Sequence, residues 1–154
     1  MNQDEIKLFF SNVHLLGTNY ERAKTIATYL RSRADGQSSN FVCIVGTSFA
    51  ARCYVDGNKW LEFENNSKDI SIGKLTSLTA IEDFKQKAIK AVDLAEQDKA
   101  GSLEDKRDRF KDAFNDKVNI IVYKDTSATY FTYSFGCSYS ERRGDTTYEA
   151  WLVE

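Results

Sequence analysis

The residues that could carry nucleophilic or metal chemistry are few. The chain has 154 residues, with one histidine, His14, and three cysteines, Cys43, Cys53 and Cys137. A Ser-His-Asp or Cys-His site needs an imidazole beside its nucleophile, and a zinc site needs several ligands at regular spacing. One histidine inside an apolar helical stretch, and cysteines without ligand spacing, supply neither. We therefore expect free thiols in a reducing compartment, no metal, no cofactor and no catalytic residue.

Carboxylates and turns give no stronger indication of catalysis. Four acidic residues surround one predicted hairpin, but they lack calcium-loop spacing, and acidic residues are common on the exposed face of a hairpin. The turn at residues 46–48 (Gly-Thr-Ser) lacks the downstream glycine and lysine of a phosphate-binding loop. The sequence therefore predicts a protein that is not an enzyme. The four acidic residues are Asp56, Glu62, Glu64 and Asp69.

Composition narrows the class of partner. The formal net charge is -2 at pH 7, with 42% hydrophobic and 29% charged residues. A net charge this close to zero does not attract nucleic acid or anionic lipid. No apolar run approaches the roughly 20 residues of a membrane helix, and the acidic N-terminus does not resemble a secretory signal. We expect a cytoplasmic protein that binds neither nucleic acid nor membranes.

Two further patterns have structural interpretations. Residues 143–145 spell the adhesion tripeptide Arg-Gly-Asp, which without a secretion signal is more simply a hairpin turn. Aromatic residues alternate near the C-terminus, which is typical of a cross-strand core and less so of a platform for stacking bases. These aromatic residues are Tyr130, Tyr133, Phe135, Tyr139 and Tyr148.

Two helices are predicted ahead of a small sheet. Apolar residues at helical spacing predict a first helix over residues 3–16, which Gly17 ends. Thr18 and Glu21 have the spacing of a capping box, which predicts the start of a second helix that runs to about Leu30. A break follows at residues 35–36 (Asp-Gly).

Short strands follow these helices. The apolar run 41–45 is typical of a strand covered on both faces. Asp56 and Gly57 predict a hairpin between the next two strands, and residues 65–68 predict another turn. The expected strands are Phe41–Val45, Ala51–Val55 and Lys59–Glu64, with a fourth, edge strand at Asp69–Ile72.

The same order restarts at Thr79. Thr79 with Glu82 predicts a second capping box, and Ser102 with Asp105 begins another helix after Gly101. The expected strands in this half are Val118–Tyr123, Ala128–Ser134 and Thr146–Val153, the last pair joined through Gly144 and Asp145.

Two helices followed by strands thus occur twice, over residues 1–76 and 79–154. The match between halves aligns Ile44-Val45 with Ile121-Val122, Ala51 with Ala128, and Tyr54 with Phe131. The order of elements predicts an α+β protein of two similar halves, each with two helices and a small antiparallel sheet. Duplication of one unit is a hypothesis that this order suggests.

The first half resembles the eight-kilodalton dynein light chain family over roughly residues 4–75. Residues 26–30 (Ile-Ala-Thr-Tyr-Leu) resemble the Ile-Ala-x-Tyr-Ile helix of that family. Residues 41–49 resemble its strand and turn, aromatic-His-Cys-Ile-Val-Gly-x-x-Phe, at a similar distance along the chain. The second half matches that family only in the order of its elements, as a diverged second copy would.

The resemblance implies two helices on a small antiparallel sheet, strand exchange between two copies, and a groove beside the second helix. There an extended peptide adds to a sheet edge, as in other strand-addition sites. Two units in one chain imply a monomeric pseudo-dimer, with a homodimer as the alternative. Carried over, the clamp on the peptide and the strand that pairs with it correspond to Lys24, Ser48, Phe49, Ala51, Arg52, Cys53, Tyr54 and Val55.

The functional hypothesis is a non-enzymatic, cytoskeletal type of adaptor or subunit that binds a linear peptide or protein partner at a sheet edge. The alternative is an acidic inhibitor, immunity protein or chaperone that binds a folded protein. A small enzyme is a third interpretation, which a pocket of converging Tyr, Arg and carboxylate groups would favour.

Overall fold

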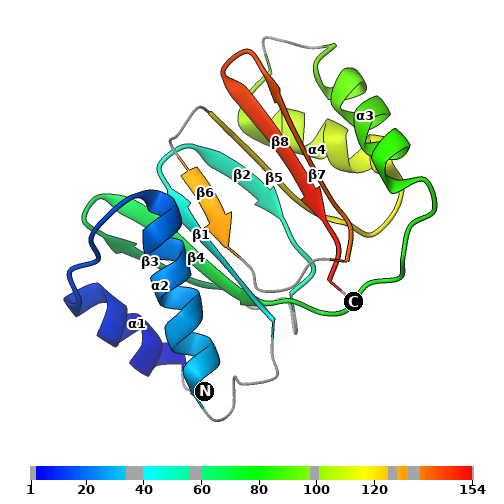
Figure 1. The fold of residues 1–154 in the computed structure, drawn as a ribbon. Helices are drawn as coiled ribbons and strands as arrows, with labels where there is room; N and C mark the ends of the chain where they lie inside the picture. Colours follow the sequence, from blue (N-terminus) through cyan, green and yellow to red (C-terminus); the bar gives the residue numbers. More distant parts are fainter. Residues whose placement is uncertain are drawn as a thin grey trace. The chain divides into compact units, whose positions relative to one another are not determined.

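The computed structural model describes residues 3–33, 40–55, 60–97, 101–124, 128–131 and 136–153. Within these ranges the chain is a mixed α+β protein with four helices and two antiparallel four-stranded sheets, which confirms the predicted class (Figure 1). It divides into two compact units. In chain order the elements are α1 (Gln3–Asn12), α2 (Asn19–Ser32), β1 (Phe41–Gly46), β2 (Phe49–Arg52), β3 (Leu61–Asn65), β4 (Lys68–Lys74), α3 (Phe84–Ala95), α4 (Leu103–Phe114), β5 (Asn119–Lys124), β6 (Ala128–Phe131), β7 (Ser138–Arg143) and β8 (Thr146–Trp151).

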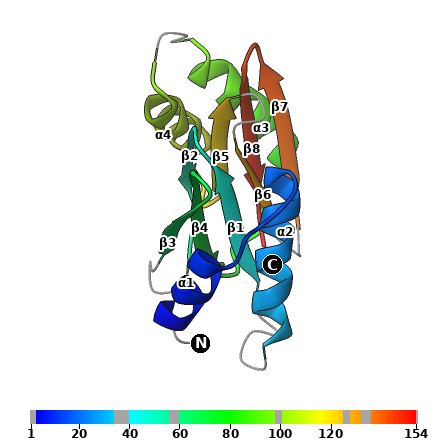
Figure 2. The same ribbon diagram turned by 90° about the vertical axis from the view of Figure 1, so that its left-hand side faces the viewer.

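The first unit comprises Met1–Thr47, Val55–Thr76 and Ser127–Tyr133. Its sheet has the strand order β3-β4-β1-β6, with α1 packed on β3 and α2 packed on β1 and β6. Figure 2 shows both helices in front of this sheet. The core lies between them, because the apolar faces of α1 and α2 and alternate residues of the strands are all buried there.

The second unit comprises Ser48–Tyr54, Ser77–Thr126 and Ser134–Glu154. Its sheet has the order β2-β5-β8-β7, with α3 packed on β7 and α4 packed on β5 and β2. The side chains between helices and sheet form a second core, whose largest members include Phe110, Phe114 and Tyr148.

Each unit takes in one short strand from the other half of the sequence. In the second unit β2 pairs with β5, and Ala50 lies opposite Val122. In the first unit β6 pairs with β1, and Thr129 lies opposite Val45. Each exchanged strand lies at one edge of its sheet. If Val45 is aligned with Val122, these pairings align Thr129 with Ala50, whereas the sequence hypothesis aligned Ala128 with Ala51.

Two of the three predicted capping boxes are present at the start of a helix. The Thr18 side chain accepts a hydrogen bond from the amide of Glu21, and Glu21 accepts one from the amide of Thr18, so the capping box of α2 is confirmed. Ser102 and Asp105 form the same box at α4. The box predicted at Thr79 is wrong, because α3 begins at Phe84 after a left-handed Asp83 without a side-chain cap.

The first helix is shorter than predicted. It ends at Asn12, where the buried Asn65 of β3 donates hydrogen bonds to the carbonyl oxygens of Phe10 and Val13 at 2.6 and 2.7 Å. A side-chain donor thus satisfies carbonyls that the end of a helix leaves unpaired. Gly17, the predicted stop, instead lies at φ +95° beside the capping Glu21.

Several strand predictions are confirmed by the sheets. All six residues of β1 are buried between β4 and β6, as the apolar run predicted. β3 and β4 form a hairpin at Asn66 and Ser67, which both have positive φ, as a two-residue turn requires. Gly144 and Asp145 are a hairpin turn, as predicted.

Other strand predictions are wrong. β2 starts two residues before the predicted Ala51 and pairs with β5 instead of the following strand. β4 is not an edge strand, since it lies between β3 and β1. The strand β7 was not predicted, because its polar residues form no apolar run. The turn at Gly144 joins β7 to β8, whereas the sequence predicted that it joins Ala128–Ser134 to that strand. The predicted break at 35–36, the hairpin turn at 56–57 and the end of a strand at Ser134 lie outside the described residues.

Because one chain supplies both exchanged strands, we expect a monomer of 17.6 kDa in light scattering. Cysteines introduced by Ala50→Cys and Val122→Cys lie opposite one another in β2 and β5, within the range that a disulfide spans. We expect them to cross-link within one chain under oxidising conditions. A mass twice as large, with a cross-link between two chains, would mean that β2 is exchanged between molecules.

Candidate functional site

The outer edge of β2 has backbone groups available for another strand. The amide of Lys124 donates to the carbonyl oxygen of Ser48, which makes this a hydrogen-bonded pair. Hydrogen-bonded and non-hydrogen-bonded pairs alternate along an antiparallel ladder, so Ala50 and Arg52 also bond to β5. The amide and carbonyl groups of Phe49 and Ala51 therefore point away from β5. Among the described residues, no strand pairs with this edge.

The helix α4 flanks this edge. In the second unit α3 packs on β7 and α4 packs on β5 and β2, so α4 is the helix nearer the β2 edge. Ala50 is 4% exposed and lies opposite Val122, whose side chain is in the core beneath the helices. Side chains alternate along a strand, so Ala50 and Arg52 share the face that α4 covers, while Phe49 and Ala51 lie on the other face.

The end of β2 is held by two contacts that the sequence did not indicate. The amide of Tyr54 donates to the side-chain oxygen of the buried Asn119 at 2.9 Å. The ammonium group of Lys117 lies 5.9 Å from the centre of the Tyr54 ring. These contacts replace the ladder beyond Arg52 and hold the strand against β5. Neither contact has a sequence signal, because both join residues more than sixty positions apart.

The predicted partner-binding residues divide between the two units. Ser48, Phe49, Ala51, Arg52, Cys53 and Tyr54 belong to the second unit, in and beside β2. Lys24 belongs to the first unit, where it is exposed on α2, and the buried Val55 belongs to the same unit. Since α2 contacts β6 in the first unit, Lys24 belongs to the helix beside the β6 edge and not to the helix beside β2. The helix that contacts β2 is α4.

Cys43 and Cys53 do not have the environment of reactive thiols. Cys43 is buried in β1, and Cys53 lies 4.0 Å from the carbonyl oxygen of Ile120. Burial raises the pKa of both thiols well above its ordinary value. Thiolates are the nucleophilic form, so neither sulfur is activated. The single histidine, His14, is exposed just after α1, with Nδ1 3.1 Å from the side-chain nitrogen of Asn66.

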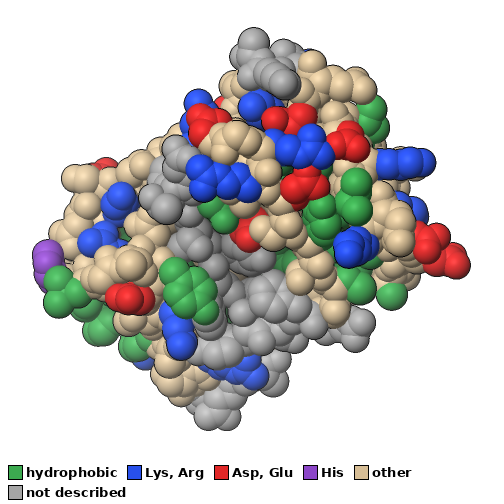
Figure 3. Space-filling model, turned by 45° about the horizontal axis from the view of Figure 1, so that its top comes forward, with side chains coloured by type: hydrophobic (Ala, Val, Ile, Leu, Met, Phe, Trp, Pro, Cys, Tyr) green, Lys and Arg blue, Asp and Glu red, His purple; other side chains and the backbone are tan. Residues whose placement is uncertain are grey.

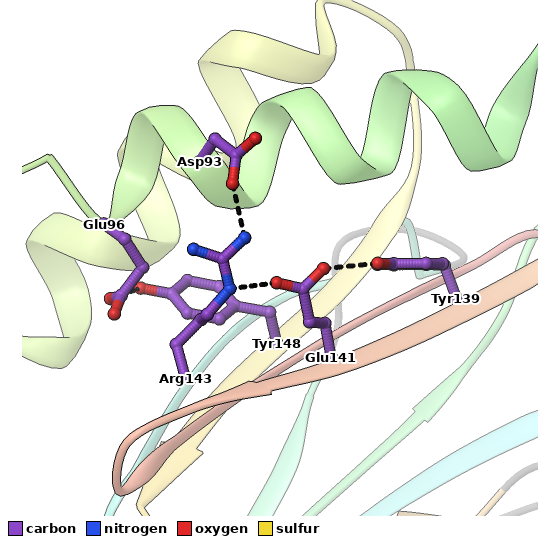
Figure 4. A network of polar contacts seen from close by, with 6 residues as sticks. All are labelled: Asp93, Glu96, Tyr139, Glu141, Arg143 and Tyr148. Atoms are coloured by element: carbon purple, nitrogen blue, oxygen red, sulfur yellow. Dashed lines mark hydrogen bonds and ion pairs between the residues drawn. The ribbon is translucent and has the colours of Figure 1, made fainter.

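A polar network joins α3 to β7 and β8 in the second unit (Figure 4). Arg143 donates to Asp93 of α3 and to Glu141 of its own strand, and Tyr139 donates to the other oxygen of Glu141. These hydrogen bonds raise the pKa of Arg143, and burial with the bond to Glu141 raises the pKa of Tyr139 to about 12. Because its members bond to one another, the network attaches the β7 edge to α3.

A buried ion pair lies behind this network. The ammonium group of Lys106 on α4 lies 3.5 Å from Glu96, and the two side chains are 8% and 12% exposed. The hydroxyl of the buried Tyr148 donates to the same Glu96 oxygen at 2.5 Å. Burial and this carboxylate both raise the pKa of Tyr148. A phenol held protonated donates a hydrogen bond and does not act as a base.

The tyrosines, arginine and carboxylates of the second unit thus converge, whereas the sequence analysis associated a pocket lined by such groups with a small enzyme. In Figure 4 they point toward one another. Each charged group named here has a partner of opposite charge, and the Tyr148 ring is part of the core. The arrangement therefore stabilises the fold of the second unit.

The face of the second sheet away from the helices carries another carboxylate of altered acidity. Burial raises the pKa of Glu149, and hydrogen bonds from Ser140 and Tyr123 partly offset this shift. Burial and the neighbouring Glu149 in turn raise the pKa of Tyr123. Glu149 therefore holds its proton more tightly in the folded protein than in the unfolded chain.

Apolar side chains are exposed around α1 and the start of α2. Figure 3 shows such side chains next to the histidine, with acidic and basic side chains intermixed elsewhere on that face. The most exposed are Leu16 at 71% and Leu8 at 65%. On α1 itself Ile6 and Phe10 are buried, whereas Phe9 is 44% exposed. Phe9 stacks on Tyr29 of α2, which explains its partial cover.

Comparisons with known proteins give no family for this chain. No family model matches it, and no curated protein or solved structure is significantly similar to it. Among the described residues, no group of three or more His, Cys, Asp and Glu side chains could hold a metal ion. The helices in that part of the chain are too short or too polar to cross a membrane. Function must therefore be inferred from the geometry.

The ion pair gives a test of the second unit. Lys106→Met leaves a buried carboxylate with only the Tyr148 hydroxyl, and breaking such a pair costs about 3–5 kcal/mol of unfolding free energy. Adding Glu96→Gln removes the unpaired charge and keeps an acceptor for Tyr148. We expect urea denaturation to show that the double variant recovers most of the loss. Additive losses would contradict a coupled pair.

Glu149 gives a test of pH dependence. Its pKa is raised in the folded state, so the protonated side chain favours folding below the unfolded pKa of about 4.3, and that stability is lost as the pH rises through the folded pKa. We expect Glu149→Gln to be progressively more stable than the original protein as the pH rises across this range. Glu62→Gln, at an exposed glutamate of β3, controls for the loss of one charge. Parallel pH profiles for both variants would contradict the assignment.

Proposed function

We propose that this chain is a non-enzymatic interaction module that binds a linear segment of a partner by strand addition at the outer edge of β2. The observation that carries the proposal is the outward direction of the Phe49 and Ala51 backbone groups next to α4. An added strand would form main-chain hydrogen bonds to these groups, and its alternate side chains would contact the α4 flank. The partner is a peptide or a protein with an extended segment.

The resemblance to the eight-kilodalton dynein light chains supports this proposal. It implies two units that exchange a strand, with a peptide at the edge of the exchanged strand. Here β2 and β6 are exchanged within one chain, and each forms an edge beside the second helix of its unit. We therefore favour two diverged copies of one dynein-light-chain-like unit, which give a monomeric pseudo-dimer with an adaptor function. The β6 edge, with Lys24 on α2, is the corresponding second site.

The other edge of the second unit's sheet, β7, is less suited to strand addition. The edge strand β7 carries Glu141, Arg142 and Arg143, and charged residues on an edge discourage pairing with another chain. Glu141 and Arg143 are also engaged in the network with α3. In contrast, Arg52 is the only charged residue of β2. The two edges therefore differ in the way expected if only β2 accepts a partner.

Proline substitutions can separate the two edges of β2. Ala51→Pro removes an amide that points outward, and proline is tolerated on an edge strand at such a position. We expect it to cost about 1 kcal/mol of stability or less while abolishing peptide binding. Ala50→Pro removes an amide that bonds to β5 and should cost about 3 kcal/mol. The probes are linear peptides of about 10 residues from a displayed random library, long enough to form a strand of roughly 5 residues.

Amide hydrogen exchange locates the bound peptide. We expect binding to slow exchange at Phe49 and Ala51, whose amides point outward, and to change Ala50 and Arg52 little. The proposal is wrong if Ala51→Pro binds the selected peptides as well as the original protein does. It is also wrong if the chain binds only a folded protein and no peptide competes, which would favour an inhibitor, immunity protein or chaperone.

A further inference from the structure

We propose that the segment added to β2 is acidic, because the cations around this edge, on β2, on α4 and just after α4, outnumber the acidic side chains there. This inference rests on the proposed function and specifies the chemistry of its partner. The chain as a whole has a net charge of -2, so this excess of cations is local to the β2 edge.

Helical geometry identifies the side chains on the flank of α4 that faces this edge. Lys106 lies on the α3 side of α4, because it pairs with Glu96 at the end of α3. Around the helix from Lys106, the buried Phe110 and Phe114 come next, facing the sheet. Arg107 and Lys111 follow them, on the side away from α3, and the exposed Glu104 comes directly after Lys111. Since α4 lies between α3 and the β2 edge, Arg107 and Lys111 face that edge.

Cations from three segments therefore flank the same edge. Arg52 of β2 is exposed and lies on the sheet face that α4 covers. Arg107 and Lys111 are half-buried on α4, and Lys117 follows α4 and lies over the Tyr54 ring. Asp108 pairs with Arg107 at 3.0 Å, with a side chain that is 57% exposed. With Glu104, two acidic side chains lie among these four cations, so an excess of positive charge remains at the edge.

The alternation of side chains along a strand defines the pattern the site would recognise. In an added strand, every second side chain would lie on the α4 face, and the residues between would lie on the other face. Glutamate or aspartate at the alternate positions would approach Arg52, Arg107 and Lys111. Complementary charges increase the rate and selectivity of association, and salt weakens them. A peptide with acidic residues at alternate positions is therefore the preferred ligand.

Three synthetic peptides of equal length test this inference by fluorescence anisotropy. They carry Glu, Gln or Lys at alternate positions of one common Thr/Val background. We expect the Glu peptide to bind at least about 10-fold more tightly than the Gln peptide at low ionic strength, with the difference falling as salt rises. The Lys peptide should bind most weakly. Ala51→Pro should remove binding of the Glu peptide, because the main-chain hydrogen bonds are required.

Charge reversal locates the preference on the chain. The double variant Arg52→Glu with Lys111→Glu should lose the preference for the Glu peptide and bind the Lys peptide more tightly. The matched control is Lys85→Glu with Lys90→Glu, which makes the same charge change at exposed positions of α3 and should keep the preference.

Each alternative result has a distinct meaning. Equal binding of the Glu and Gln peptides, abolished by Ala51→Pro, would overturn the acidic partner and leave strand addition intact. Binding of no peptide at all would overturn both. A single-stranded oligonucleotide that displaces the Glu peptide and still binds the Ala51→Pro variant would overturn the inference by identifying a site for nucleic acid.

Discussion

The pairing of β2 with β5 is the constraint on which the second unit depends. It brings Ala50 over the core beneath α4, and it allows the Tyr54 amide to reach the buried Asn119. Without β2, one side of β5 would leave buried backbone groups without partners, which is costly. The same pairing fixes which backbone groups of β2 face outward. The stability of the unit and the outward direction of these backbone groups thus have one structural origin.

The two edges of the second sheet show how the unit controls strand pairing. At β7, Arg143, Glu141 and Asp93 bond to one another and join the edge to α3. At β2, short length limits the ladder to four residue pairs, and a helix with cationic side chains lies alongside. An exposed edge is an aggregation hazard unless it is short, charged or covered. The β2 edge is short and flanked by charged side chains, and both features limit its pairing with other copies of the chain.

Much of this fold follows from local sequence signals, and its central feature does not. The capping boxes at Thr18 and Ser102 were predictable because their hydrogen bonds join residues three positions apart. The covered strand β1 was predictable from an apolar run. The partner of β2 was not, because the Asp56-Gly57 signal favours a local hairpin, while the observed partner β5 is about seventy residues away. β7 was missed for a different reason: its polar residues match no apolar pattern.

In the candidate site, too, some residues were identified from the sequence, while others depend on pairing between distant segments. The residues of β2 were identified through a family resemblance, but Lys24 was assigned to them on the assumption that one half of the sequence forms one unit. Strand exchange replaces α2 by α4 as the helix beside β2, and so replaces Lys24 by Arg107 and Lys111. If the β6 edge also binds a segment, different helices flank the two edges. Five and nine residues after its cap, α2 has Ala23 and Ala27, whereas α4 has Arg107 and Lys111 at these positions. On the proposed function, the two edges of one chain would therefore select different segments, which the identical edges of a symmetric dimer cannot do.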